Sequence, residues 1–285
     1  MRHVYECPTR WADLDMLGHV NNVVYVDYLQ EARVDMMRTL FAHRRGDLTE
    51  GVVVVRHAVT YLTPLMFGRP TVTVECWISE VRAATFTLTY EVLHTAEDGT
   101  RTVYVRATTT LTPYVFADER PRRITAEEKA RLATYLEPPD VGAPLRAPAI
   151  AEVQREGAHH FPLHVRFSDV DAYRHVNNVK YFEFLQESRI RMVGDLVDRQ
   201  QLNFPGLVVA QTDVEYRAPI LMRAEPYDLY SEIVRVGGRS MTVESEIADG
   251  DITLARGRVV VVFFDPKAGH SVEPSPEVRA ALTIR

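Results

Sequence analysis

The sequence contains one polar block twice, and this repeat restricts the chain to folds built from two similar halves. Residues 13–22 read DLDMLGHVNN and residues 169–178 read DVDAYRHVNN. Over the longer stretches 10–36 and 166–192, 14 of 27 positions are identical at a constant shift of 156 residues. Further identities follow at a shift of 155: Gly51/Gly206, Val53/Val208, Val54/Val209, Val59/Val214, Tyr61/Tyr216 and Pro64/Pro219. A repeat of this length indicates two copies of one structural unit.

A helix is predicted directly after each polar block, over about 22–40 in the first copy and about 178–197 in the second. Mostly apolar residues recur there at the three- and four-residue spacing of one helix face. They are Tyr25, Leu29, Ala32 and Met36 in the first copy, and Tyr181, Leu185, Ser188 and Met192 in the second. Asn is a favoured residue at helix N-termini, so HVNN is a suitable helix entrance.

Strands rich in β-branched residues are predicted before and after each helix. We expect them near 2–11, 52–62, 71–78, 85–92 and 102–112 in the first copy, and near 160–167, 207–217, 226–236, 240–248 and 252–264 in the second. Short turns between consecutive strands favour antiparallel pairing. Each copy is therefore expected to be an α+β unit, in which one helix lies against a mostly antiparallel sheet of about five strands.

The stretch between the copies differs from both in composition. Residues 125–140 predict a short amphipathic helix that ends at two prolines, and a Pro- and Ala-rich stretch without clear periodicity follows. We therefore expect a first domain over 1–137, a linker over 138–157 and a second domain over 158–285.

Charge and composition exclude several classes of protein. The formal net charge is −6 and the pI about 5.9, so no nucleic-acid partner is indicated. No signal-peptide core is present, and no apolar run approaches the ~18 residues of a membrane span, so a soluble, cytoplasmic protein is expected. The two cysteines give no disulfide framework and are expected to be buried. The histidines show no metal-ligand spacing, and no Gly-rich phosphate loop occurs, so no metal or cofactor is expected.

The order of these features resembles the hotdog-fold thioesterases, most closely the 4-hydroxybenzoyl-CoA thioesterase type and its acyl-CoA and acyl-ACP relatives. Both copies have a first strand, the block Asp-x-Asp-x-x-x-His-Val-Asn-Asn-x-x-Tyr at the entrance of a long helix, and four further strands. The resemblance implies a tandem hotdog chain, in which a curved sheet wraps each helix, the two units pair, and the active sites lie at their interface. It also leaves open a homodimer or a higher homo-oligomer.

The resemblance implies catalytic roles for four residues. In many members the second acidic residue of the Asp pair is the catalytic carboxylate, and it matches Asp15 and Asp171. A backbone N–H at the helix entrance polarises the thioester carbonyl, and it falls at Asn22 and Asn178. Elementary chemistry agrees, because a helix N-terminus offers free N–H donors and partial positive charge. A nearby carboxylate can act as a general base, or attack the thioester and form an anhydride. Coenzyme A would then be part of the substrate.

The histidines His19 and His175 match residues that take part in catalysis in the acyl-ACP relatives. Those relatives also use an Asn two residues after the catalytic Asp, and here Leu17 and Tyr173 occupy that position. The difference favours an acyl-CoA substrate over an acyl-ACP one. A second interpretation of both histidines is that they only position the loop.

Other polar residues of the block are expected to order the loop. Asp can cap a helix or a turn, and this interpretation stays open for Asp15 and Asp171 as well. Asn21 and Asn177 are expected to fix the loop near the substrate, and Asp13 and Asp169 to bond to loop backbone. Tyr25 and Tyr181 lie on the buried helix face and are expected in the core.

Glu31 and Glu187 are reserve candidates for the catalytic carboxylate, because some hotdog thioesterases place it on the central helix. Glu31 lies four residues after Asp27, which also suits an ordinary ion-paired helix surface.

Two alternatives to an acyl-CoA thioesterase remain open, and the two sites of a thioesterase need not be equally active. An (R)-specific enoyl-CoA hydratase would carry Asp and His five residues apart with Asn-Pro between them, whereas the separation here is four. A non-catalytic acyl-CoA-binding protein would keep the fold and lose the reaction. The loops MLG (16–18) and AYR (172–174) differ between the copies, so we also expect two sites of unequal activity.

Overall fold

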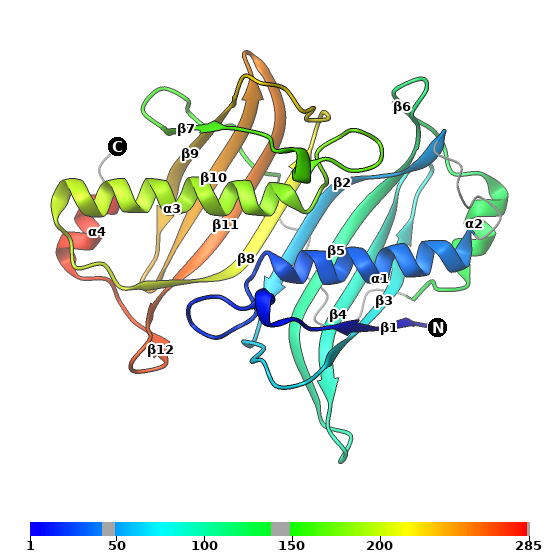
Figure 1. Cartoon of the computed structure of the whole chain (residues 1–285), viewed down its shortest axis with the longest axis horizontal. Helices are drawn as coiled ribbons and strands as arrows, with labels where there is room; N and C mark the ends of the chain where they lie inside the picture. Colours follow the sequence, from blue (N-terminus) through cyan, green and yellow to red (C-terminus); the bar gives the residue numbers. More distant parts are fainter. Residues whose placement is uncertain (42–48, 138–148, 284–285) are drawn as a thin grey trace. The chain divides into compact units, whose positions relative to one another are not determined.

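The computed structural model describes residues 1–41, 49–137 and 149–283. It divides into two compact units, Met1–Ala147 and Pro148–Arg285 (Figure 1). Of the expected linker 138–157, the part 138–148 lies outside the described residues. The remainder packs within the second unit, where Ile150 and Val153 are buried. The domain boundaries stay a prediction.

The first unit is a five-stranded antiparallel sheet with one long helix against it (Figure 1). The strands are β1 (His3–Pro8), β2 (Glu50–Tyr61), β3 (Thr71–Val81), β4 (Phe86–Thr95) and β5 (Arg101–Val115), and they lie in the order β1-β3-β4-β5-β2. A two-residue strand, β6 (Arg120–Pro121), pairs with β5. The long helix is α1 (Val24–Leu40), and a short helix, α2 (Ala126–Ala133), follows the sheet.

The second unit repeats this arrangement element by element. Its strands are β7 (His159–Leu163), β8 (Gly206–Tyr216), β9 (Tyr227–Val236), β10 (Ser240–Asp249) and β11 (Ile252–Asp265), in the order β7-β9-β10-β11-β8. The two-residue strand β12 (His270–Ser271) pairs with β11. Its long helix is α3 (Lys180–Gln200), and α4 (Pro276–Thr283) follows the sheet as α2 does in the first unit. The predicted α+β class is confirmed in both units, whereas α4 was not expected.

The core of each unit lies between the long helix and the sheet, as the helical spacing predicted. All eight residues of the two predicted helix stripes are buried, and Leu29, Ala32, Met36 and Ser188 are 0 % exposed. Both cysteines are free and buried, as expected. Within the described residues, no helix combines the length and the apolar character needed to cross a membrane.

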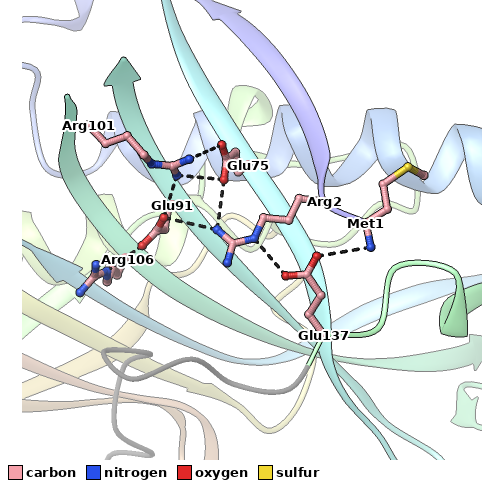
Figure 2. Close-up of polar contacts among 7 residues, drawn as sticks. All are labelled: Met1, Arg2, Glu75, Glu91, Arg101, Arg106 and Glu137. Atoms are coloured by element: carbon pink, nitrogen blue, oxygen red, sulfur yellow. Dashed lines mark hydrogen bonds and ion pairs between the residues drawn. The ribbon is translucent and has the colours of Figure 1, made fainter. Parts of the chain in front are cut away.

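The opposite face of the first unit's sheet carries a network of ion pairs (Figure 2). Arg101 and Arg2 both bond to Glu75 of β3, at 2.9 and 3.1 Å. Burial opposes ionisation of Glu75, but the hydrogen bonds from Arg101 and Arg2 outweigh it and lower its pKa. Glu91 extends the network through Arg101 and Arg106, and Glu137 extends it through Arg2. The network thus ties β3, β4 and β5 to the first residues of the chain and to the residues after α2.

The helix core gives a first prediction, for the substitution Leu29→Ala. Leu29 is 0 % exposed, so the substitution removes packed apolar atoms and leaves a cavity. We expect a loss of about 2–5 kcal/mol in the free energy of unfolding, measured by urea denaturation. Val34→Ala, at a 36 % exposed position of the same helix, is the control and should change stability by less than about 1 kcal/mol. Equal losses in the two variants would contradict the assignment of the buried face.

The ion-pair network gives a second prediction, on the pH dependence of stability. Because the folded pKa of Glu75 lies below its ordinary value of 4.5, its contribution is fully present above that value and is lost as the pH falls through the folded pKa. Urea denaturation from pH 7 to about pH 3 should therefore show a shallower loss of stability in Glu75→Gln than in the wild type. Glu97→Gln, an exposed position of the same unit, should keep the wild-type profile.

Candidate active site

Asp13 and Asp169 hold the loop that leads into each long helix. Asp13 Oδ2 accepts the backbone N–H of Arg10 at 2.7 Å and the hydroxyl of Tyr28 at 2.5 Å. Its carbonyl accepts the N–H of Asn21 at 2.8 Å. Asp169 repeats the two backbone contacts, at 2.7 Å from Arg166 and 2.8 Å from Asn177, and is 4 % exposed. These contacts fit the loop-ordering role that the sequence suggested.

Asp15 and Asp171 close a tight turn with one carboxylate oxygen. Asp15 Oδ1 accepts the N–H groups of Leu17 and His19, at 2.8 and 3.2 Å. Asp171 Oδ1 accepts the N–H of Tyr173 at 2.9 Å. Both side chains are half-buried. Within residues 1–41, 49–137 and 149–283, Oδ2 of either residue accepts no hydrogen bond. One oxygen therefore orders the turn while the other stays available, so capping and catalysis are compatible in the same side chain.

The long helices begin two residues later than the predicted starts at about 22 and about 178. Asn21 Oδ1 accepts the N–H of Val23 at 3.0 Å, and its carbonyl accepts that of Val24, also at 3.0 Å. Asn177 makes the equivalent bonds to Val179 and Lys180. The first Asn of each pair thus accepts the N–H groups of the residue before the helix and of its first residue, and the helices begin at Val24 and Lys180 instead of at the second Asn.

The second Asn of each pair sits at the entrance without capping it. The carbonyl of Asn22 accepts the hydroxyl of Tyr61 at 2.9 Å, and that of Asn178 accepts the hydroxyl of Tyr216 at 2.8 Å. In the part of the chain that the structure describes, the backbone N–H of Asn22 has no acceptor. It lies at the positive end of the α1 dipole, where a developing oxyanion is stabilised. The two tyrosines were visible in the sequence only as repeated identities.

The histidines of the block are fixed through their backbones. His19 forms an isolated β-bridge with Met66, and His175 forms one with Leu221. The N–H of Asp15 donates to the carbonyl of His19 at 2.8 Å. Each imidazole is therefore carried by the same turn as the candidate carboxylate, and both rings are half-buried.

The remaining candidates lie on the long helices. Tyr25 and Tyr181 are each 3 % exposed, as predicted, and burial raises the pKa of both phenols. Glu31 and Glu187 are exposed, on the side of each helix away from the core. Glu31 is seven residues beyond the start of α1, or about 10 Å along the helix. Neither unit by itself brings its helix carboxylate to the turn that holds Asp15 or Asp171.

Among the described residues, no group of three or more His, Cys, Asp or Glu side chains lies in a position to hold a metal ion.

A difference between the two turns gives a third prediction. Gly18 has φ of +76°, and Arg174 takes the equivalent position with φ of +64°. A non-glycine residue in this left-handed region costs roughly 1–2 kcal/mol, partly offset by the greater unfolded-state entropy of glycine. We expect Arg174→Gly to raise the free energy of unfolding by about 0.5–1 kcal/mol, measured by urea denaturation. Gly18→Ala should lower it by a similar amount. Ala172→Gly, in the same turn, should give no gain.

Comparisons with known proteins agree on one family. The model of the Thioesterase-like superfamily matches residues 9–141 and 165–282. A putative oleoyl thioesterase from Lactobacillus plantarum has the same fold, with 17% identity, a TM-score of 0.73, and coverage of 93% of this chain and 97% of that chain. The 12:0-ACP thioesterase from Umbellularia californica has 16% identity, a TM-score of 0.74, and coverage of 93% and 94%. No curated protein gives a significant match. Two hotdog repeats in one chain and a family match over both of them show that the chain belongs to the Thioesterase-like superfamily.

Proposed function

We propose that the protein hydrolyses acyl-CoA thioesters, with Asp15 and Asp171 as the catalytic carboxylates of two sites. Membership of the Thioesterase-like superfamily supports thioester hydrolysis in general. One observation carries the finer assignment. Counting only the residues that the structure describes, the turn before α1 holds a carboxylate with one oxygen bound and one unbonded, and the adjoining helix entrance holds, at Asn22, an N–H without an acceptor.

The reaction needs a nucleophile at the carbonyl carbon and a donor at the carbonyl oxygen. The N–H of Asn22, and that of Asn178 in the second site, polarises the carbonyl and stabilises the oxyanion, worth about 3 kcal/mol for one such donor. The carboxylate of Asp15 takes a proton from water as the water oxygen attacks the carbonyl carbon. The C–S bond then breaks, and the thiolate leaves with that proton as free thiol. Free acid is the other product.

A second route uses the same carboxylate as the nucleophile. Asp15 Oδ2 attacks the carbonyl carbon, the thiolate leaves, and water hydrolyses the resulting anhydride. Hydrolysis in ¹⁸O-labelled water under single-turnover conditions tests for this route. Label in the Asp15 side chain would establish the anhydride, whereas label in the released acid alone fits both routes. Label appears in the Asp15 side chain only when water attacks the anhydride at the aspartyl carbon.

The carrier is proposed to be coenzyme A. The acyl-ACP relatives use an Asn two residues after the catalytic Asp, and Leu17 and Tyr173 stand there in this chain. His19 and His175 are then assigned to positioning the turn and the attacking water. Because the Umbellularia protein named above acts on 12:0-ACP, an acyl-ACP substrate is the competing assignment and belongs in the same assay.

The fourth prediction concerns the two carboxylates. Thiol release from acyl-CoAs of varied chain length, a benzoyl-type CoA and an acyl-ACP should be measured for the wild type, Asp15→Asn, Asp171→Asn and the double variant. We expect the double variant to lose at least a hundredfold in kcat, the usual scale of general-base catalysis. The single variants should lose unequal shares, because their turns differ.

The control for this assay is the pair of helix carboxylates. Glu31→Gln and Glu187→Gln should keep wild-type rates, because both side chains are exposed away from the turns. Loss of activity in these variants together with full activity in the double aspartate variant would move the catalytic carboxylate to the helices. Acyl-CoA that raises the melting temperature without being cleaved would instead favour a binding protein.

A further inference from the structure

A strand tyrosine contacts the helix entrance in the same way in both units. Tyr61 is the last residue of β2, and its hydroxyl donates to the carbonyl of Asn22 at 2.9 Å. Tyr216 is the last residue of β8, and its hydroxyl donates to the carbonyl of Asn178 at 2.8 Å. The partners are 39 and 38 residues apart in the chain. The two copies have diverged, yet both form this long-range hydrogen bond. We infer that the helix entrance needs the bond to keep its conformation.

Each tyrosine is held in place by an aromatic residue of the long helix. The Tyr61 ring lies edge-on to the Tyr25 ring, with centroids 5.9 Å apart, and Tyr216 lies edge-on to Tyr181 at 4.8 Å. Tyr25 is itself anchored, because its hydroxyl accepts the N–H of Leu65 at 3.2 Å. The orientation of the Tyr61 hydroxyl toward the helix entrance is therefore fixed by three parts of the unit. They are the end of β2, the buried face of α1 and the loop after β2.

This contact acts on the residue whose N–H is the proposed oxyanion donor. On one side of that residue, Asn21 is anchored by its N–H to the carbonyl of Asp13 at 2.8 Å. On the other side, the Tyr61 hydroxyl anchors the carbonyl of Asn22 itself. The peptide that carries the Asn22 N–H thus lies between two fixed points. An oxyanion donor is effective only when it is oriented before the charge develops, so such anchoring contributes directly to the rate.

We propose that Tyr61 and Tyr216 are positioning residues for the oxyanion donors. Each acts, within its own unit, through the carbonyl of the same Asn whose N–H is the donor. The proposal rests on the proposed function, because it assigns these N–H groups to the thioester carbonyl. The tyrosines contact neither substrate nor reacting atoms in this role. Their effect falls on kcat, since the oriented N–H binds the developing oxyanion more strongly than the ground-state carbonyl.

The decisive experiment uses the repeat as its own control. Tyr61→Phe is placed in the Asp171→Asn background, where only the first site works, and in the Asp15→Asn background, where only the second works. We expect a roughly five- to tenfold fall in kcat in the first background, the scale of one lost hydrogen bond, with KM changed less than twofold. The second background should be unaffected. Tyr216→Phe should show the reverse pattern.

A matched variant controls for the loss of any tyrosine hydroxyl. Tyr114 is half-buried in β5 and lies opposite Gly51, at the other end of β2 from Tyr61, so Tyr114→Phe should leave kcat and KM unchanged in both backgrounds. Equal rate losses from Tyr61→Phe in the two backgrounds would show a general structural role and overturn the proposal. So would a rise in KM with kcat unchanged.

Hydrogen exchange separates this proposal from the proposed function. In wild type and Tyr61→Phe, exchange is followed by mass spectrometry in peptides that cover 19–26 and 175–182. We expect faster exchange in 19–26 only, and the opposite pattern in Tyr216→Phe. Unchanged exchange in both would overturn the positioning role whatever the activity. A third outcome is full activity in Asp15→Asn and Asp171→Asn together with faster exchange of 19–26 in Tyr61→Phe. The function assignment would then fail, and the anchoring role of Tyr61 would stand.

Discussion

The hydrogen bonds of Asp13 and Asp169 are the constraint on which each candidate site depends. A loop that leaves a strand and enters a helix must satisfy several backbone donors away from regular structure. In each unit one aspartate does this twice, through its carboxylate to the start of the loop and through its carbonyl to the first Asn of the pair. Without this clamp the turn of Asp15 and the helix entrance would not be held at a constant distance from one another.

The clamp divides the work between the two acidic residues of each block. The carboxylate of Asp13 accepts hydrogen bonds from the backbone of Arg10 and the hydroxyl of Tyr28, so it holds the loop in place. Asp15 bonds its turn with one oxygen only. A reactive group needs a fixed position together with an unused atom, and this arrangement provides both. The same logic applies at the entrance, where Asn21 accepts the N–H groups of Val23 and Val24, and the N–H of Asn22 has no acceptor within the described residues.

The two units keep this loop while their cores diverge. At three core positions the first unit has Ala32, Cys76 and Tyr90, and the second has Ser188, Ser231 and Ser245. The three serines bond in a chain, at 2.8 Å from Ser188 to Ser231 and 2.7 Å from Ser231 to Ser245. Because each of these three buried serine hydroxyls has a hydrogen-bond partner, the polar substitutions are tolerated. Conservation of the loop amid such changes supports its assignment as the functional part of each unit.

The sequence alone determined the architecture and the candidate loop of each unit. The repeat implied two similar units, and the helical and alternating periodicities placed the long helices and the ten main strands within a few residues. These features are local or periodic, because each depends on neighbours a few positions away. The block that carries Asp15 and Asp171 was found for the same reason, since its residues are contiguous.

Only the tertiary structure decided how the entrance is held. The helix starts two residues later than predicted because the side chain of Asn21 bonds to Val23, which two adjacent Asn residues do not reveal. The contact of Tyr61 with Asn22 joins a strand end to a helix entrance 39 residues away, and no spacing rule encodes such a pair. The exposure of Glu31 likewise depends on which helix face meets the sheet. Local pattern therefore determined what each segment is, and the packing of distant segments decided which of its atoms are bonded and which are left for chemistry.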